Sequence, residues 1–300
     1  MIGTDSSAII ECQGLTHYYG KRLIYEGLTF TVPRGRILGL LGKNGTGKTT
    51  TINILAGYLK PRSGVCKMFG YDIQSMPPEV KANIALLIEG HVQYSFMTVE
   101  EIEHFYARFY PRWQRDIYYD LVSLLKIAPH QRISRMSCGQ RSQVALGLIL
   151  AQDADLLVLD DFSLGLDPGY RRLFIDYLKE FTKGRDKTVF LTSHIIQDME
   201  RLIDDCIILD YGKILLQMPV AELMSSFHRY LIKLEVEGLE LPTDPKLWHP
   251  AVIGNQAEVH SFEGMGYIRE YLAKHQLPYS QLVEERMSLE DVFIGLTGKY

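Results

Sequence analysis

The sequence lacks long apolar runs and any large excess of one charge. Its longest apolar stretch, VALGLILA (144–151), is far shorter than the roughly 20 residues that a membrane-spanning helix needs. The opening residues show no basic segment followed by an apolar one, so we expect no signal peptide. The 32 basic and 36 acidic residues give a formal net charge of −4, which argues against nucleic acid as a partner. We therefore expect a soluble protein.

Cysteine is scarce and widely spaced. The chain has four cysteines, with no C-x-x-C pair and no histidine nearby that would suggest a metal centre. Reduced, scattered thiols are typical of cytosolic proteins, so we expect a cytoplasmic protein. The four residues are Cys12, Cys66, Cys138 and Cys206.

The hydrophobic pattern favours an α/β fold. With 300 residues, 46% of them hydrophobic, the chain can form one large domain or one domain with a small appendage. Short apolar runs alternate with helical patterns, as in sheets with buried central strands. We expect strands at 28–32, 36–41, 155–160 and 187–192, helices at about 48–59, after 168 and after 193, and a hairpin over 206–217 that turns at Tyr211-Gly212.

Beyond about residue 218 the pattern weakens. A strand is expected within 230–238, a loop over 244–256, and helices after it. We therefore place one domain at 1–218, with a mainly helical part at about 95–152, and a small accessory domain at 219–300.

A glycine-rich segment, GLLGKNGTGKTT (39–50), fits the pattern G-x-x-x-x-G-K-[ST]. Its glycines allow successive backbone N–H groups to turn toward phosphate oxygens, and the helix that follows adds its positive dipole. Lys48 is expected on the β- and γ-phosphates, and the Thr49 hydroxyl on Mg²⁺. The expected ATP-binding residues of this loop are Gly42, Lys43, Asn44, Gly45, Thr46, Gly47, Lys48, Thr49 and Thr50.

Two carboxylates end a later apolar strand. Asp160 closes the run LLVLD and is expected to ligate Mg²⁺ directly or through water, while Asp161 could polarise an attacking water. An acidic helix cap after a core strand is the alternative interpretation.

These motifs together resemble the ATPase subunit of ABC transporters. The glycine-rich segment 39–50, which corresponds to the family's Walker A motif or P-loop, is followed in the family's order by SCGQ (137–140), LLVLDD (156–161), GLD (165–167) and TSH (192–194), and the resemblance covers about residues 8–217. The resemblance implies a P-loop NTPase core with a mixed sheet, an N-terminal antiparallel β region and a helical subdomain, plus a small α+β C-terminal domain.

The resemblance also assigns roles outside the P-loop. Tyr19 would stack on adenine, with Tyr18 as the competitor, and packing within a strand is the alternative role for either tyrosine. Asp167 corresponds to the D-loop acid, and His194 to the switch histidine that contacts the γ-phosphate. Glu89 stands at the position of the Q-loop glutamine and could ligate Mg²⁺; Gln93 is the alternative occupant.

The signature turn would contact the ATP of a partner subunit through Ser137, Cys138, Gly139 and Gln140. Cys138 replaces a glycine. Its side chain either points away from that ATP or weakens closure and marks one half of an asymmetric heterodimer.

Asp161 stands where the family usually has glutamate. The shorter side chain withdraws the carboxylate by about 1.5 Å, and a displacement of that size can cost roughly a hundredfold in rate. We therefore expect ATP hydrolysis that is real but slow.

By resemblance, the protein powers an ABC transporter with ATP and Mg²⁺. The expected partners are a second ATPase subunit, a homodimer in preference to a heterodimer, and a separate membrane permease that holds it at the inner face of the cell membrane. The tail MSLEDVFIGLTGKY (287–300) favours an exporter-type system. The alternatives are a soluble, non-transport ABC ATPase and a regulatory ATP binder with slow or no turnover.

Two segments have open roles. The aromatics of 100–125 either form the core and surface of the helical subdomain or line a groove for the permease. The tail spaces its apolar residues as an amphipathic docking helix would: Leu289, Val292, Phe293 and Leu296.

Overall fold

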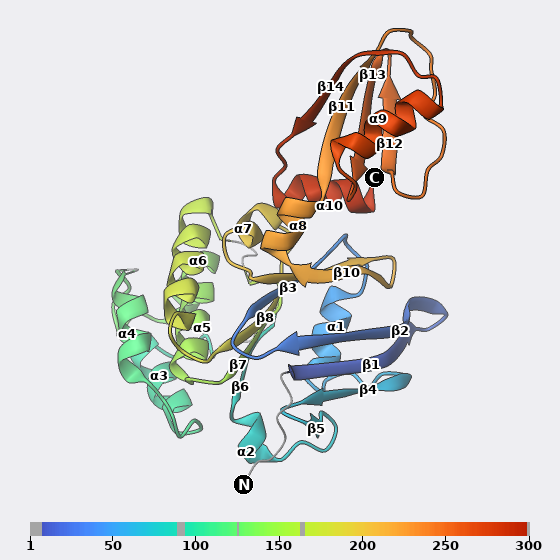
Figure 1. Ribbon diagram of the computed structural model, residues 1–300. Helices are drawn as coiled ribbons and strands as arrows, with labels where there is room; N and C mark the ends of the chain where they lie inside the picture. Colours follow the sequence, from blue (N-terminus) through green and yellow to red (C-terminus); the bar gives the residue numbers. More distant parts are fainter. Residues whose placement is uncertain (1–7, 89–93, 125, 163–165, 299–300) are drawn as a thin grey trace. The chain divides into compact units, whose positions relative to one another are not determined.

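The computed structural model describes residues 8–88, 94–124, 126–162 and 166–298 (Figure 1). The chain divides into two units, Met1–Gln217 and Met218–Tyr300. Within the described ranges, no helix is both long and apolar enough to cross a bilayer.

A six-stranded sheet forms the centre of the first unit, in the order β10-β9-β3-β8-β7-β6. The pairs β3–β8, β3–β9, β7–β8 and β6–β7 are parallel. Its inner strands are almost wholly buried, which explains their uninterrupted apolar sequences. The strands are β3 (Ile37–Gly42), β6 (Ile84–Leu87), β7 (Leu156–Leu159), β8 (Thr188–Thr192), β9 (Asp205–Asp210) and β10 (Lys213–Pro219).

The predicted hairpin between β9 and β10 is confirmed. Tyr211 and Gly212 both have positive φ, 39° and 79°, as the two central residues of a tight hairpin turn of this kind require. A Cβ at Gly212 would lie 2.4 Å from the carbonyl oxygen of Ile24, so only glycine fits the position.

A second, antiparallel sheet has the order β2-β1-β4-β5. Helix α1 (Lys48–Leu55) shares one hydrophobic core with this sheet and with the central one. The helix ends earlier than the 48–59 expected, because Gly57 takes a left-handed conformation (φ 75°) directly after the C-cap. The strands are β1 (Ala8–Tyr19), β2 (Arg22–Pro33), β4 (Ser63–Met68) and β5 (Tyr71–Asp72).

The remaining helices include a group of three, α3, α4 and α5, which pack on one another (Figure 1). Tyr118 is fully buried there and donates a hydrogen bond to the Val99 carbonyl at 2.8 Å. The other aromatics of 100–125 are half-buried or exposed. The helices are α2 (Pro78–Lys81), α3 (Val99–Ala107), α4 (Arg115–Leu124), a 3₁₀ turn (Ile133–Arg135), α5 (Cys138–Ala151), α6 (Pro168–Thr182) and α7 (Ile196–Glu200).

The second unit is a four-stranded antiparallel sheet, β12-β13-β11-β14, with three helices. Helix α9 shares a hydrophobic core with one face of the sheet. The elements are α8 (Val220–Ser226), β11 (His228–Leu234), β12 (Trp248–Ile253), β13 (Gln256–Ser261), α9 (Met265–Lys274), β14 (Tyr279–Glu285) and α10 (Leu289–Thr297).

The expectation of a loop over 244–256 is wrong. Trp248–Ile253 is the edge strand β12, and Gln256 begins β13. Pro250 weakened the strand signal in the sequence, yet an edge strand tolerates proline because one of its sides needs no ladder hydrogen bonds.

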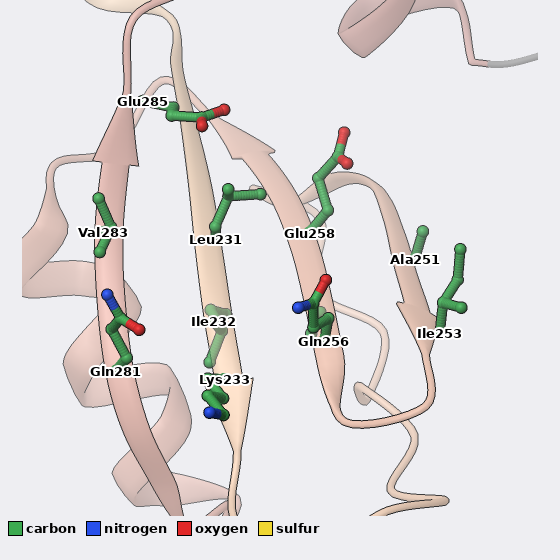
Figure 2. Close-up of a pocket in the computed structure, with 11 residues that line it drawn as sticks. Leu231, Ile232, Lys233, Ala251, Ile253, Gln256, Glu258, Gln281, Val283 and Glu285 are labelled. Atoms are coloured by element: carbon green, nitrogen blue, oxygen red, sulfur yellow. The ribbon is translucent and has the colours of Figure 1, made fainter.

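The amphipathic tail helix is confirmed as α10, and its apolar side is used within its own unit. Leu289, Val292, Phe293 and Leu296 are all buried. Gly295 of α10 lies directly against the ring of His260 on β13. The rest of that sheet face is an open, shallow pocket of about 370 Å³, where Leu231 and Val283 mix with polar side chains (Figure 2).

Together these features confirm the predicted fold class: a mixed central sheet, an N-terminal antiparallel sheet, a helical group, and a small α+β unit at the C-terminus.

Candidate nucleotide-binding site

The loop between β3 and α1 is shaped by its glycines. Gly45 and Gly47 have φ of 79° and 107°, which L side chains rarely adopt. A Cβ at Gly47 would lie 2.8 Å from side-chain atoms of Ile24 and Tyr25, and one at Gly42 would lie 2.7 Å from the Leu209 carbonyl oxygen. The backbone can therefore pass this close to its neighbours only without side chains at these positions.

Lys48, the first residue of α1, folds back over the loop. Its Nζ donates hydrogen bonds to the carbonyls of Gly42, at 2.7 Å, and of Lys43, at 3.0 Å. Burial lowers the pKa of its ammonium, and the nearby carboxylates of Asp161 and Asp160 act in the opposite sense. The ammonium is thus held within the loop that would receive phosphate.

Asp160, just past the end of β7, is buried with a relative exposure of 1%. Its Oδ1 accepts a hydrogen bond from the Thr192 hydroxyl at 2.7 Å and lies 3.5 Å from the Thr49 hydroxyl. Its Oδ2 has no hydrogen-bond partner among the described residues. Burial raises the pKa of this carboxyl group, while the two hydroxyls lower it.

The geometry of this carboxylate fits a hard cation. A desolvated carboxylate oxygen without a partner, beside a threonine hydroxyl, is an oxygen donor set of the kind that Mg²⁺ prefers. Asp160 and Thr49 could therefore hold Mg²⁺.

Asp161 and His194 form a direct pair. Nδ1 of His194 lies 2.7 Å from one carboxylate oxygen of Asp161 and 2.8 Å from the other. The Asp161 backbone has φ of 42°, and its N–H donates to the Thr192 hydroxyl at 3.0 Å. Thr192 at the end of β8 thus contacts both acids and fixes the spacing of Asp160, Asp161 and the histidine.

These groups line one pocket of about 490 Å³. Its lining includes residues at or just after the ends of β3, β7 and β8, and the carboxyl edge of a parallel sheet is where ligands usually bind. Its lining residues are Tyr19, Arg22, Ile24, Asn44, Gly45, Gly47, Lys48, Thr49, Thr50, Asp160, Asp161, Thr192 and His194.

Tyr19 rather than Tyr18 lines the pocket. It ends β1, it is 49% exposed, and its ring meets His17 edge-on at 5.0 Å. Three lining residues escaped the sequence analysis: Arg22, Ile24 and Thr192. The threonine of TSH and the arginine three residues after Tyr19 are visible in the sequence. Their side chains reach the pocket because of strand pairing, however, which the local sequence does not reveal.

Some expected residues lie outside the lining. Lys43 and Thr46 are buried, and the Thr46 hydroxyl donates to the Lys43 carbonyl at 2.8 Å, so both support the loop from within. Gly42 is the last residue of β3, directly before the loop. Glu89 and Gln93 lie outside the described residues.

The signature turn lies apart from the pocket lining, at the start of α5. Ser137 Oγ accepts from the Gln140 N–H at 3.2 Å, and Gln140 Oε1 accepts from the Ser137 N–H at 3.1 Å. This capping box forms the turn within the chain itself. Cys138 is exposed, and a Cβ at Gly139 would make only ordinary contacts.

Asp167 caps a different helix. Its Oδ1 accepts from the N–H groups of Gly169 and Tyr170 at 3.0 and 3.1 Å, at the start of α6. In the single chain its contact is therefore that of an N-cap.

Comparisons with known proteins agree with these features. A family model described as ABC transporter matches residues 25–163. The Nod factor export ATP-binding protein I of Ralstonia nicotianae is 28% identical over 99% of this chain and 96% of its own length. The bacitracin transport ATP-binding protein BcrA of Bacillus licheniformis is 25% identical over 97% of this chain and 98% of its own. A solved ATP-binding subunit of an ABC transporter superposes with a TM-score of 0.64 at 25% identity, over 72% of this chain and 92% of that one.

Proposed function

The chain belongs to the family of ABC transporter ATP-binding subunits, and from this premise we propose that it binds and hydrolyses ATP to power an export-type transporter. The observation that carries the proposal is the single pocket in which the P-loop, Asp160, Asp161, His194 and Tyr19 meet. These groups come from strands and loops far apart in the chain, and each matches a requirement of phosphoryl transfer.

Nucleotide recognition uses both ends of the pocket. The N–H groups around Gly45 and Gly47, together with the start of α1, face the phosphates, and the Lys48 ammonium adds a charge there. The exposed ring of Tyr19, which also lines the pocket, offers a surface on which the adenine stacks.

Thr49 and Asp160 hold Mg²⁺, with Glu89 as a further ligand predicted from the sequence. The cation neutralises charge on the phosphate oxygens when it is bound. Oδ2 of Asp160, desolvated and without a partner among the described groups, supports this assignment.

Asp161 and His194 act on the attacking water and the terminal phosphate. A carboxylate held 2.7 Å from an imidazole nitrogen can accept a proton from water while the ring keeps it oriented. Because aspartate is shorter than the usual glutamate, turnover is slow.

Two partners complete the proposal. A second copy of the subunit presents its Ser137–Gln140 turn to the γ-phosphate, and ATP binding closes this dimer. The permease docks near an exposed aromatic cluster in which Phe105 meets Tyr94 and Phe109 edge-on at 5.1 Å. Tyr94 and Phe109 are 42% and 63% exposed. The export direction is supported by the name of the Nod factor relative.

Purification from membranes tests this function. We expect the protein to co-purify with an integral membrane protein and to release phosphate from ATP only with Mg²⁺. Recovery without any membrane partner would favour a soluble, non-transport ATPase, and ATP binding without phosphate release would favour a regulatory binder. A Lys48→Ala variant is the control for contaminating ATPases.

A further inference from the structure

One charged residue of the nucleotide pocket is used by none of the motifs. Arg22 begins β2 directly across the hairpin from Tyr19, and its side chain lines the pocket. Its Nη2 lies 3.1 Å from the position that a Cβ of Gly45 would occupy. The guanidinium therefore lies close to the P-loop at Gly45, where an added Cβ would make a tight contact with it.

The second observation is that the Arg22 side chain has no polar partner among the described residues. Among the residues that the structure describes, its guanidinium makes no hydrogen bond and no ion pair. An arginine that supports the fold normally satisfies several of its five donors. Here they remain available on the side of the pocket facing the phosphate loop.

The charge balance of the pocket indicates how Arg22 could favour the binding of a polyphosphate. Lys48 and Arg22 are its two permanent cations, and Asp160 and Asp161 are its two carboxylates. Without Arg22 the acids would outnumber the cations, and the pocket would repel a polyphosphate until Mg²⁺ compensated. Lys48 is moreover turned toward two loop carbonyls, whereas the Arg22 guanidinium is free to reorient.

We infer that Arg22 is a phosphate-binding residue of this chain: its guanidinium contacts the polyphosphate of ATP from the β1–β2 hairpin and raises nucleotide affinity. The inference rests on the proposed function. Arginine suits the task because its planar fork can donate two parallel hydrogen bonds to phosphate oxygens. Its position on the hairpin that carries Tyr19 couples base recognition to phosphate recognition.

Binding measurements on the full chain test this. Arg22→Gln removes the charge and keeps a polar side chain of similar shape, Arg22→Lys keeps the charge without the fork, and Lys21→Gln removes an equal charge from the exposed neighbour that does not line the pocket. Isothermal titration gives the dissociation constants of ATP with Mg²⁺ and of ADP. Competition with a fluorescent ATP analogue gives that of adenosine. Circular dichroism checks that each variant is folded.

We expect Arg22→Gln to weaken ATP and ADP binding roughly three- to tenfold, a modest loss because the group is exposed to water. Adenosine affinity stays unchanged, Arg22→Lys is intermediate, and Lys21→Gln behaves as wild type. Raising the salt concentration should weaken ATP binding less in Arg22→Gln than in wild type, because one charge contact is missing.

Two results would overturn the inference. In one, Arg22→Gln matches Lys21→Gln for every ligand. In the other, it weakens adenosine as much as ATP, which would place the side chain on the base or ribose. Either differs from failure of the proposed function, in which the wild-type chain itself does not bind ATP.

Discussion

At the scale of single residues, the buried carboxylate of Asp160 favours metal binding but lowers the folding stability of the ligand-free protein. Its Oδ2 lacks a partner in the described part of the chain, and burial raises the pKa of the group above its ordinary value near 3.8. A carboxyl group whose pKa rises on folding binds its proton more tightly in the native state. Folding stability therefore falls as the pH increases from near 3.8 through the raised pKa, and the whole cost remains at neutral pH.

We therefore predict that Asp160→Asn stabilises the ligand-free protein at neutral pH by roughly 1 kcal/mol, because it removes a buried charge whose Oδ2 has no hydrogen-bond partner among the described residues. The gain shrinks as the pH falls through the raised pKa of Asp160, because its carboxyl group then becomes neutral as well. Urea unfolding at several pH values measures it. Asp176→Asn, at an exposed position of α6, is the matched control. A gain that does not depend on pH, or one that the control reproduces, would contradict the argument.

The neighbouring acid, Asp161, carries two opposing constraints. Its φ of 42° lies in the left-handed region, which costs most L residues roughly 1–2 kcal/mol and which aspartate tolerates better than most. Its short side chain, on the other hand, is proposed to hold the carboxylate back from the attacking water. Asp161→Glu is therefore expected to raise steady-state ATP hydrolysis and to lower the melting temperature slightly. Phosphate release and thermal unfolding measure the two effects.

Unchanged or lower hydrolysis in Asp161→Glu would refute the argument from side-chain length. Asp161→Asn, which keeps the length without the charge, should abolish turnover.

At the scale of elements, the start of α5 combines a structural and a proposed binding role in one side chain. Ser137 caps the helix through Gln140, and replacing such a cap by alanine costs about 1 kcal/mol. The same hydroxyl is proposed to meet the γ-phosphate bound by a partner subunit. The two roles separate if a substitution keeps one and removes the other.

Ser137→Asp makes that separation. Aspartate is as good an N-cap as serine, so we predict wild-type unfolding free energy, whereas its negative charge repels the partner's phosphate and abolishes ATP-driven dimerisation. Ser137→Ala, by contrast, removes the helix cap without adding a charge, and it should lower the free energy of unfolding by about 1 kcal/mol. Urea unfolding and size-exclusion chromatography with Mg²⁺-ATP provide the readouts. Dimerisation that survives Ser137→Asp would disprove the proposed contact.

Elements also show what the sequence could predict. The strand–loop–helix around the P-loop and the turn at Tyr211-Gly212 follow from local patterns, glycine positions and apolar runs, and both are found. Contacts set by register were not predictable. Cys12 and Cys66 look scattered in the sequence, yet they face each other across β1 and β4 with their Sγ atoms 2.8 Å apart.

The candidate site follows the same division. Motif spacing identified the acids and the P-loop, because each is a local signal. The contact of His194 with Asp161 depends on the pairing of β7 with β8, and the approach of Arg22 to Gly45 depends on the packing of the β1–β2 hairpin against the P-loop. Both are tertiary facts that no window of sequence contains.

At the scale of the whole molecule, each of the two units has a hydrophobic core of its own among the described residues. One joins the two sheets of the first unit around α1, and the other lies between α9 and the sheet of the second unit. All the described residues that line the nucleotide pocket belong to the first unit. Because a ligand stabilises the cooperative unit that binds it, ATP should protect the two units unequally.

The two tryptophans make this measurable, since each unit contains one. Trp113 lies in the first unit, where its Nε1 donates to Glu103 at 2.8 Å, and Trp248 lies in the second, against Phe227. Trp248→Phe and Trp113→Phe therefore leave one fluorescent reporter for each unit. With Mg²⁺-ATP at about a hundred times its dissociation constant, we predict that the transition reported by Trp113 gains about 2.7 kcal/mol and that the one reported by Trp248 does not move. Adding Lys48→Ala should remove the gain. Equal shifts at both reporters would instead mean that the two units unfold as one cooperative unit, because ATP bound to the first unit then stabilises both.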